Sequence, residues 1–117
     1  MSTKSSRIEA IIGNHLQAFF RKSVDDVVQD YTEGSVLIVP DGPLHGLSEI
    51  REFFTAFIST LPAGFLEAFE MHRQEFDGEV GYIVWKASPW VRLGTDTFFV
   101  RSGKIMLQTF AAYPPLS

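Results

Sequence analysis

The 117-residue chain contains no cysteine, and several other common features are also missing from it. Without cysteine there is no disulfide, no thiolate zinc site and no cysteine nucleophile. No block of like charges occurs, and the net charge is −4. A nucleic-acid-binding surface needs a basic patch, so we expect no nucleic-acid partner.

Long apolar runs are absent as well. The first ten residues, MSTKSSRIEA, carry little positive charge, and they lack the following apolar run of roughly 7–15 residues that marks a signal peptide. No stretch approaches the roughly 20 apolar residues that span a bilayer. These observations predict a soluble, cytoplasmic protein with no membrane partner. The length favours a single domain over residues 1–117.

Aromatic residues, in contrast, are abundant: the chain has 11 Phe, 3 Tyr and 2 Trp. This exceeds what a small core requires, and it indicates an interior lined with aromatic rings. Such rings are more often packed core than pocket wall, so the pattern alone leaves both interpretations open.

The first half of the sequence has helical periodicity. Apolar side chains recur at intervals of three and four over residues 5–22, which predicts an amphipathic helix. Ser23 is the expected N-cap of a short second helix, and residues 36–39 are predicted to form a buried strand. Residues 40–43, Pro-Asp-Gly-Pro, predict a turn, and Ser48 is expected to cap a third helix.

The second half alternates with the period of two that is typical of strands, and short turn sequences separate its segments. The predicted strands are residues 65–76, 80–87, 90–101 and 105–113. Helices followed by an antiparallel meander predict an α+β fold. We expect a cone in which three N-terminal helices pack on one face of a strongly curved, mainly antiparallel sheet.

His15 lies within the apolar stripe of the first predicted helix, so its ring points toward the core. Burying an unpaired polar group costs roughly 1–3 kcal/mol, so His15 requires a partner or a cavity. One interpretation is a core histidine bonded to a backbone carbonyl. The other is a functional histidine, which needs a second polar group in the same interior.

Asp96 is the candidate for that second group. Alternation along residues 90–101 places Asp96 on the same face as Phe98, opposite Thr97 and Phe99. A carboxyl group among aromatic rings has a raised pKa and can donate a hydrogen bond or carry a proton. The alternative is a carboxylate that bonds a neighbouring strand's backbone or lies at a sheet edge.

Further residues complete the candidate site. The candidate ligand-binding side chains are Phe19, Trp85, Phe98, Gln108 and Phe110. His45 is expected in an exposed loop, and His72 lies among charged neighbours. The histidines show no HxH, HxxxH or HExxH spacing, so we expect neither a metal site nor a cofactor.

The opposite sheet face carries Thr95, Thr97, Phe99, Leu107 and Thr109 in alternation. Phe99 and Leu107 would expose apolar area in a monomer. We therefore expect a homodimer formed through this outer face.

The order of elements resembles that of the nuclear transport factor 2 superfamily, on its ketosteroid isomerase-like and SnoaL-like branch. The resemblance covers nearly the whole chain. It depends on PDGPLHGLSEIREFF over residues 40–54 and on DTFFVRSGKI over residues 96–105. It implies the cone-shaped fold, which hosts many unrelated chemistries.

The resemblance also implies roles for individual residues. His15 corresponds to the isomerase's oxyanion-hole tyrosine, and Asp96 to its protonated oxyanion-hole aspartic acid. Val39 replaces the general-base aspartate, and a valine cannot take a proton. Asp41, two residues later, is the candidate catalytic replacement if its loop folds inward. Phe110 stands where the polyketide cyclases have an acid.

Three functions remain open from the sequence. In the first, the chain is an enzyme of isomerase, cyclase or dehydratase type, in which His15 and Asp96 bind or protonate an oxygen of a small hydrophobic substrate. In that case Asp41 or His45 is the candidate base. Alternatively, it binds such a molecule without turnover, or it is a structural dimer with a filled interior.

Overall fold

The computed structural model describes residues 4–115 and contains four helices and one sheet. The helices are α1 (Lys4–Phe20), α2 (Val24–Val28), α3 (Gly46–Thr60) and α4 (Phe65–Ala68). The strands are β1 (Val36–Val39), β2 (Gly42–His45), β3 (Phe69–Asp77), β4 (Val80–Ala87), β5 (Val91–Arg101) and β6 (Lys104–Tyr113). The predicted α+β class is confirmed.

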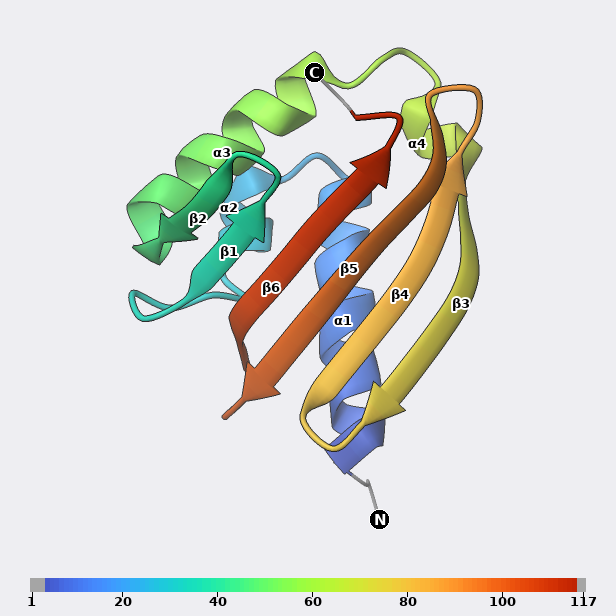
Figure 1. Ribbon diagram of the computed structural model, residues 1–117. Helices are drawn as coiled ribbons and strands as arrows, with labels where there is room; N and C mark the ends of the chain where they lie inside the picture. The colour runs from blue at the N-terminus through green and yellow to red at the C-terminus, as the bar shows by residue number, and fades with distance from the viewer. Residues whose placement is uncertain (1–3, 116–117) are drawn as a thin grey trace.

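The six strands form one sheet in the order β2-β1-β6-β5-β4-β3. All neighbours run antiparallel except β1 and β6, which are parallel. Register shifts in the three long hairpin pairs, between β3 and β4, β4 and β5, and β5 and β6, are irregularities of the kind that bend strands. The sheet is therefore curved but not closed, and α1 lies behind it in Figure 1.

The apolar stripe of α1 faces the sheet as its sequence predicts. Ile8 and Ile12 are almost fully buried, and His15, one turn further along, is only 3% exposed. A close approach at Gly81 of β4 makes this packing possible, because a Cβ at that position would collide with the Ile12 side chain. The core therefore fills the space between α1 and the concave face of the sheet.

The start of α2 agrees with the sequence. The Ser23 side chain accepts a hydrogen bond from the Asp26 backbone N–H at 3.2 Å, and Asp25 and Asp26 occupy the first turn. Acidic residues at a helix N-terminus interact favourably with the helix dipole. The Ser23 N-cap is thus confirmed.

Three local predictions were wrong. Residues 42–45, placed partly in a turn, form β2, with Pro40 and Asp41 as the tight turn that precedes it. The N-cap of α3 is His45 rather than Ser48, because the helix begins immediately after β2. The strand predicted from residue 65 begins at Phe69, after the short helix α4.

The two faces of the sheet differ sharply. The face toward the helices is buried, whereas the outer face, which looks toward the viewer in Figure 1, has no helix over it within residues 4–115. Among residues 6–115, the exposed large apolar side chains all lie on strands: Ile38, Val80, Leu93, Leu107 and Tyr113. By register and alternation, Ile38, Leu107 and Val80 share this outer face with Phe99 and Thr97.

No helix within residues 4–115 is long and apolar enough to cross a membrane.

Candidate functional site

A cavity of about 50 Å³ lies between the helices and the concave face of the sheet. Its wall is almost entirely apolar. The lining residues are His15, Leu16, Phe19, Leu37, Phe53, Phe54, Phe57, Phe65, Phe69, Ile83, Trp85, Asp96, Phe98, Gln108 and Phe110. The three polar members, His15, Asp96 and Gln108, come from α1, β5 and β6 and are all buried.

His15 is bound to a carboxylate. Its Nδ1 lies 3.2 Å from Oδ2 of Asp30, whose side chain is 21% exposed. Three aromatic rings surround the imidazole edge to face: Tyr31, Phe54 and Phe98, with centroids 5.7–6.0 Å away. This packing leaves the ring little freedom to rotate.

The second ring nitrogen of His15, Nε2, makes no hydrogen bond to any residue in 4–115. Every fully buried side-chain nitrogen or oxygen in that part of the chain has a partner. Nε2 is therefore not fully buried, and His15 is one of the residues that line the cavity. In a neutral ring whose Nδ1–H donates to Asp30, Nε2 carries the lone pair.

Asp96 is held by two neutral donors. The Trp85 indole N–H donates to Oδ1 at 2.9 Å, and the Gln108 amide donates to Oδ2 at 2.9 Å. Burial raises the pKa of Asp96. The two hydrogen bonds lower it again, as does the positive charge of His15 when its ring is protonated, but burial has the larger effect. The carboxyl group therefore has an increased tendency to hold a proton.

Tyr31 extends this network. Its hydroxyl donates a hydrogen bond to Oε1 of Gln108, so the amide is held at both ends. Burial, followed by the charges of Asp96 and Asp30, raises the pKa of Tyr31 well above its ordinary value. Tyr31 thus keeps its proton at neutral pH and remains a donor.

The indole of Trp85 reaches Asp96 because Gly94 has no side chain. Trp85 and Gly94 are paired in the register of β4 and β5, and a Cβ at position 94 would overlap the indole ring. The ring lies flat across the glycine and stacks on Phe69, with centroids 5.1 Å apart.

The cavity thus brings together most of the predicted site residues. His15 and Asp96 line it, and so do Phe19, Trp85, Phe98, Gln108 and Phe110. The predicted face sharing of Asp96 and Phe98 is confirmed by their common burial. Whether these residues bind or convert a ligand remains a prediction.

Other candidates lie elsewhere. Asp41 is exposed in the turn between β1 and β2 and does not line the cavity. His45 and His72 are exposed as well. Val39, in contrast, is a buried core residue. The loop at Asp41 does not fold inward, so the structure offers no support for Asp41 as the base.

Sequence reasoning missed the partner of His15. Asp30 follows α2, fifteen residues from His15, and no local pattern connects them. Tyr31 lies in the segment after α2, which ends at Val28. A buried imidazole needs a hydrogen-bond partner, so the sequence indicated that His15 has one. That rule did not say which residue the partner is.

The described residues 4–115 contain no group of three His, Asp or Glu side chains placed to hold a metal ion. The three polar side chains of the cavity include two that are already joined to each other, Asp96 and Gln108. This arrangement is suited to contacting one oxygen-bearing organic group.

Comparison with known proteins gives structural matches only. No protein-family model matches the sequence, and no curated protein matches it. An NTF-2 like protein of unknown function from Burkholderia xenovorans LB400 superposes with a TM-score of 0.76 and 18% identity, covering 99% of this chain and 90% of the other. The chain has the nuclear transport factor 2-like fold.

Two further structures show the range of proteins with this fold. A ketosteroid isomerase-like protein from Erwinia carotovora atroseptica SCRI1043 has a TM-score of 0.66 and 16% identity, covering 98% of this chain and 100% of its own. TerC, co-crystallised with polyporic acid, has a TM-score of 0.72 and 12% identity, with 93% of each chain covered. The nuclear transport factor 2-like fold implied by the sequence resemblance is therefore confirmed.

Proposed function

We propose that the cavity binds a small hydrophobic molecule with a carbonyl or hydroxyl oxygen, and that the protein transfers a proton on that molecule. The reaction class is that of an isomerase, cyclase or dehydratase. One observation supports this above all: His15 and Asp96 line the same aromatic-walled cavity from opposite elements. Such a pocket, with few polar groups among apolar walls, is typical of small-molecule sites.

His15 is the proposed base. In the proposed mechanism Asp30 accepts the Nδ1–H and so keeps the lone pair on Nε2, and His15 lines the cavity. Asp30 itself is a positioning residue, because it acts through His15. This arrangement supplies the proton acceptor that Val39 cannot provide.

Asp96 is the proposed hydrogen-bond donor to the substrate oxygen. Burial raises the pKa of its carboxyl group, which favours the protonated form that can donate. Nε2 of His15 removes a proton from the carbon next to a carbonyl, and the C–H electrons form an enol-type double bond. The carbonyl oxygen becomes the oxyanion that Asp96 stabilises. The imidazolium then returns the proton to a different carbon, which completes an isomerisation.

The structural neighbours give limited support. One is described as ketosteroid isomerase-like, and TerC was co-crystallised with polyporic acid, an organic ligand. At 12–16% identity these matches concern the fold, so the proposal depends on the cavity itself.

A suitable test is the isomerisation of 3-cyclohexenone to 2-cyclohexenone, followed by ultraviolet absorbance. His15→Gln removes the base, and general base catalysis is worth roughly 10²–10⁴-fold. We expect kcat to fall by that amount, while His72→Gln, an exposed control, leaves it unchanged. Asp96→Asn is compared with Asp77→Asn, an exposed aspartate on β3. Equal rates for His15→Gln and His72→Gln would refute the proposed base.

The second candidate is a binding module without turnover. The observation in its favour is Val39, which replaces the general-base aspartate of the isomerases and is a buried apolar residue. In this case cyclic ketones bind, the binding is weakened by substitution of His15 or Asp96, and no isomerisation is detected. A purely structural role is supported only if no ligand binds.

A further inference from the structure

The free volume of the cavity is too small for the ligand that its polar groups suggest. A site of about 50 Å³ has room for water, whereas a dry protein cavity known to accept benzene measures about 150 Å³. A six-membered ring can enter only if a wall residue moves. The question is which residue that is.

The wall has a buried part and a half-buried part. Phe54, Phe65, Trp85 and Phe98 are buried in the core. The half-buried rings of the wall are Phe19, Phe53, Phe57, Phe69 and Phe110. Because the second group is partly exposed to solvent, its members separate the cavity from the outside.

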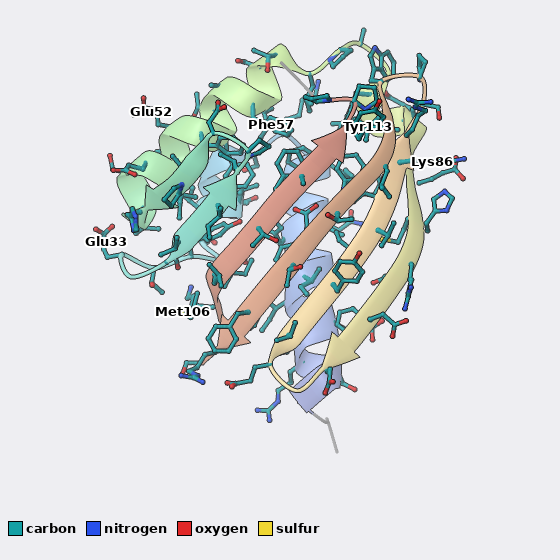
Figure 2. All side chains as sticks on the ribbon, viewed as in Figure 1. Glu33, Glu52, Phe57, Lys86, Met106 and Tyr113 are labelled. Atoms are coloured by element: carbon teal, nitrogen blue, oxygen red, sulfur yellow. The ribbon has the colours of Figure 1, made fainter. Side chains whose placement is uncertain are left out.

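Phe57 is the central ring of that group. Its centroid lies 5.3 Å from Phe53, 5.5 Å from Phe110 and 6.0 Å from Phe19. These partners come from α3, β6 and α1, so the Phe57 ring closes the space where the three elements meet. Figure 2 shows Phe57 on α3, directed toward β6.

The Phe57 ring is held in place by contacts between side chains. The close backbone packing of α3 is with α2 and β2, near its N-terminal half. Phe57 lies in the last turn of the helix, which runs to Thr60, and its contact with Phe110 of β6 is made by side chains. A rotation of the Phe57 side chain would therefore change contacts between side chains and no pairing between strands.

We infer that Phe57 is the gate of the cavity and the residue that determines ligand size, and that the ligand is a single planar six-membered ring bearing a hydroxyl or carbonyl oxygen. This inference rests on the proposed function. The ligand ring takes the contacts of the displaced benzyl ring with Phe53, Phe110 and Phe19, which favour a flat aromatic or enone ring. Its oxygen then meets Asp96 and His15 deeper in the cavity.

Isothermal titration calorimetry with phenol, cyclohexanol and 2-naphthol tests this. We expect wild type to bind phenol at least tenfold more tightly than cyclohexanol, and to bind 2-naphthol weakly. Phe57→Ala removes a ring the size of benzene and is expected to bind 2-naphthol at least tenfold more tightly than wild type. Phe76→Ala is the matched control, since Phe76 is also half-buried but does not line the cavity.

A milder variant, Phe57→Leu, gives the same test if the alanine variant is unstable, with an expected gain of at least threefold for 2-naphthol. Binding of 2-naphthol that is equal in the Phe57 and Phe76 variants overturns the gate. Equal binding of phenol and cyclohexanol overturns the planar ligand class. If folded wild type and both Phe57 variants bind none of the three compounds, the proposed function fails together with the inference.

Discussion

Trp85 lies directly opposite Gly94 in the register of β4 and β5, and its indole occupies the space that a side chain at position 94 would fill. This pairing carries the indole N–H to Asp96, so one missing Cβ determines how the buried carboxyl group is held. The relationship can be tested without any ligand.

Gly94→Ala is expected to destabilise the protein by about 1–3 kcal/mol, because overpacking displaces the indole. The N–H would also lose its bond to Asp96. Urea unfolding measures the free energy, and Trp fluorescence reports the displacement. The same substitution at Gly13, an exposed glycine of α1 with open space around it, is the control. In a helix it is expected to stabilise by roughly 0.5–1 kcal/mol. Equal effects at the two sites would contradict the assigned role of Gly94.

Asp96→Asn is expected to raise stability at neutral pH. Burial raises the pKa of Asp96 in the folded state above its unfolded value. The stability from the protonated form is therefore complete below the unfolded pKa and is lost as pH rises through the folded pKa. The gain in free energy of unfolding of the asparagine variant should reach about 1.4 kcal/mol for each unit by which the folded pKa of Asp96 exceeds the unfolded pKa.

Urea unfolding at several pH values measures this difference, with Asp77→Asn as the exposed control. Asparagine can keep the Trp85 bond, and the Gln108 amide can turn over to accept from it, so the packing is preserved. A stability difference that does not vary with pH would show that Asp96 is not the titrating group.

Asp30→Asn is expected to change the tautomer of His15. With the carboxylate present, Nδ1 carries the proton and Nε2 the lone pair; the amide can instead present its N–H to Nδ1. The ¹⁵N chemical shifts of the imidazole distinguish these forms. We expect at least a tenfold fall in kcat for ketone isomerisation alongside the tautomer change. A changed tautomer with unchanged kcat would remove Asp30 from the mechanism.

We propose that the outer sheet face binds a second copy of the chain. Ile38, Phe99 and Leu107 lie close together on this face, and Thr97 and Thr109 add uncharged neighbours. Such a surface matches itself in a symmetric dimer. In the proposed dimer, Leu107→Lys places two positive charges near each other across the interface. It is expected to shift the measured molecular mass from that of a dimer to that of a monomer.

Light scattering at micromolar concentration gives the mass, and Ala56→Lys, on the exposed side of α3, is the control. A wild-type chain that is monomeric at this concentration contradicts the proposed dimer.

Much of the fold was predictable because its long elements have clear periods. The stripe containing Ile8, Ile12 and His15 fixed the buried face of α1, and alternation along β5 separated Asp96 from Thr97. In both cases the buried face is set by the spacing of apolar residues, so the sequence pattern alone is enough to predict it. The predicted cytoplasmic location stays a prediction.

Short elements were not predictable. The strand β2 has four residues and includes Pro43, and α4 has four residues. Segments of this length form because of tertiary contacts: β2 pairs with β1, and α4 packs Phe65 into the core. Their local sequences carry too little information to distinguish a turn from a strand or helix.

The candidate site was predictable in part, because alternation within a strand can be read from the sequence and contacts between distant segments cannot. Asp96 was placed by strand alternation, and Gln108 was named as a candidate ligand-binding residue. The bond between them depends on the register, in which Gln108 faces Phe98 and reaches Asp96 diagonally. Asp30 was out of reach, since its approach to His15 depends on how the chain turns between α1 and α2.

The orientation of the Gln108 amide determines which groups donate and which accept hydrogen bonds in the buried network. A carboxylate at Asp96 only accepts, so Gln108 must present its nitrogen there and its oxygen to Tyr31, whose hydroxyl must donate. A protonated Asp96 removes this constraint, and the amide can then face either way. The charge on Asp96 is thereby communicated to Tyr31, which also lines a surface hollow with Arg51 and Lys104. The direction of the hydrogen bond between Tyr31 and Gln108 therefore depends on whether Asp96 carries a proton.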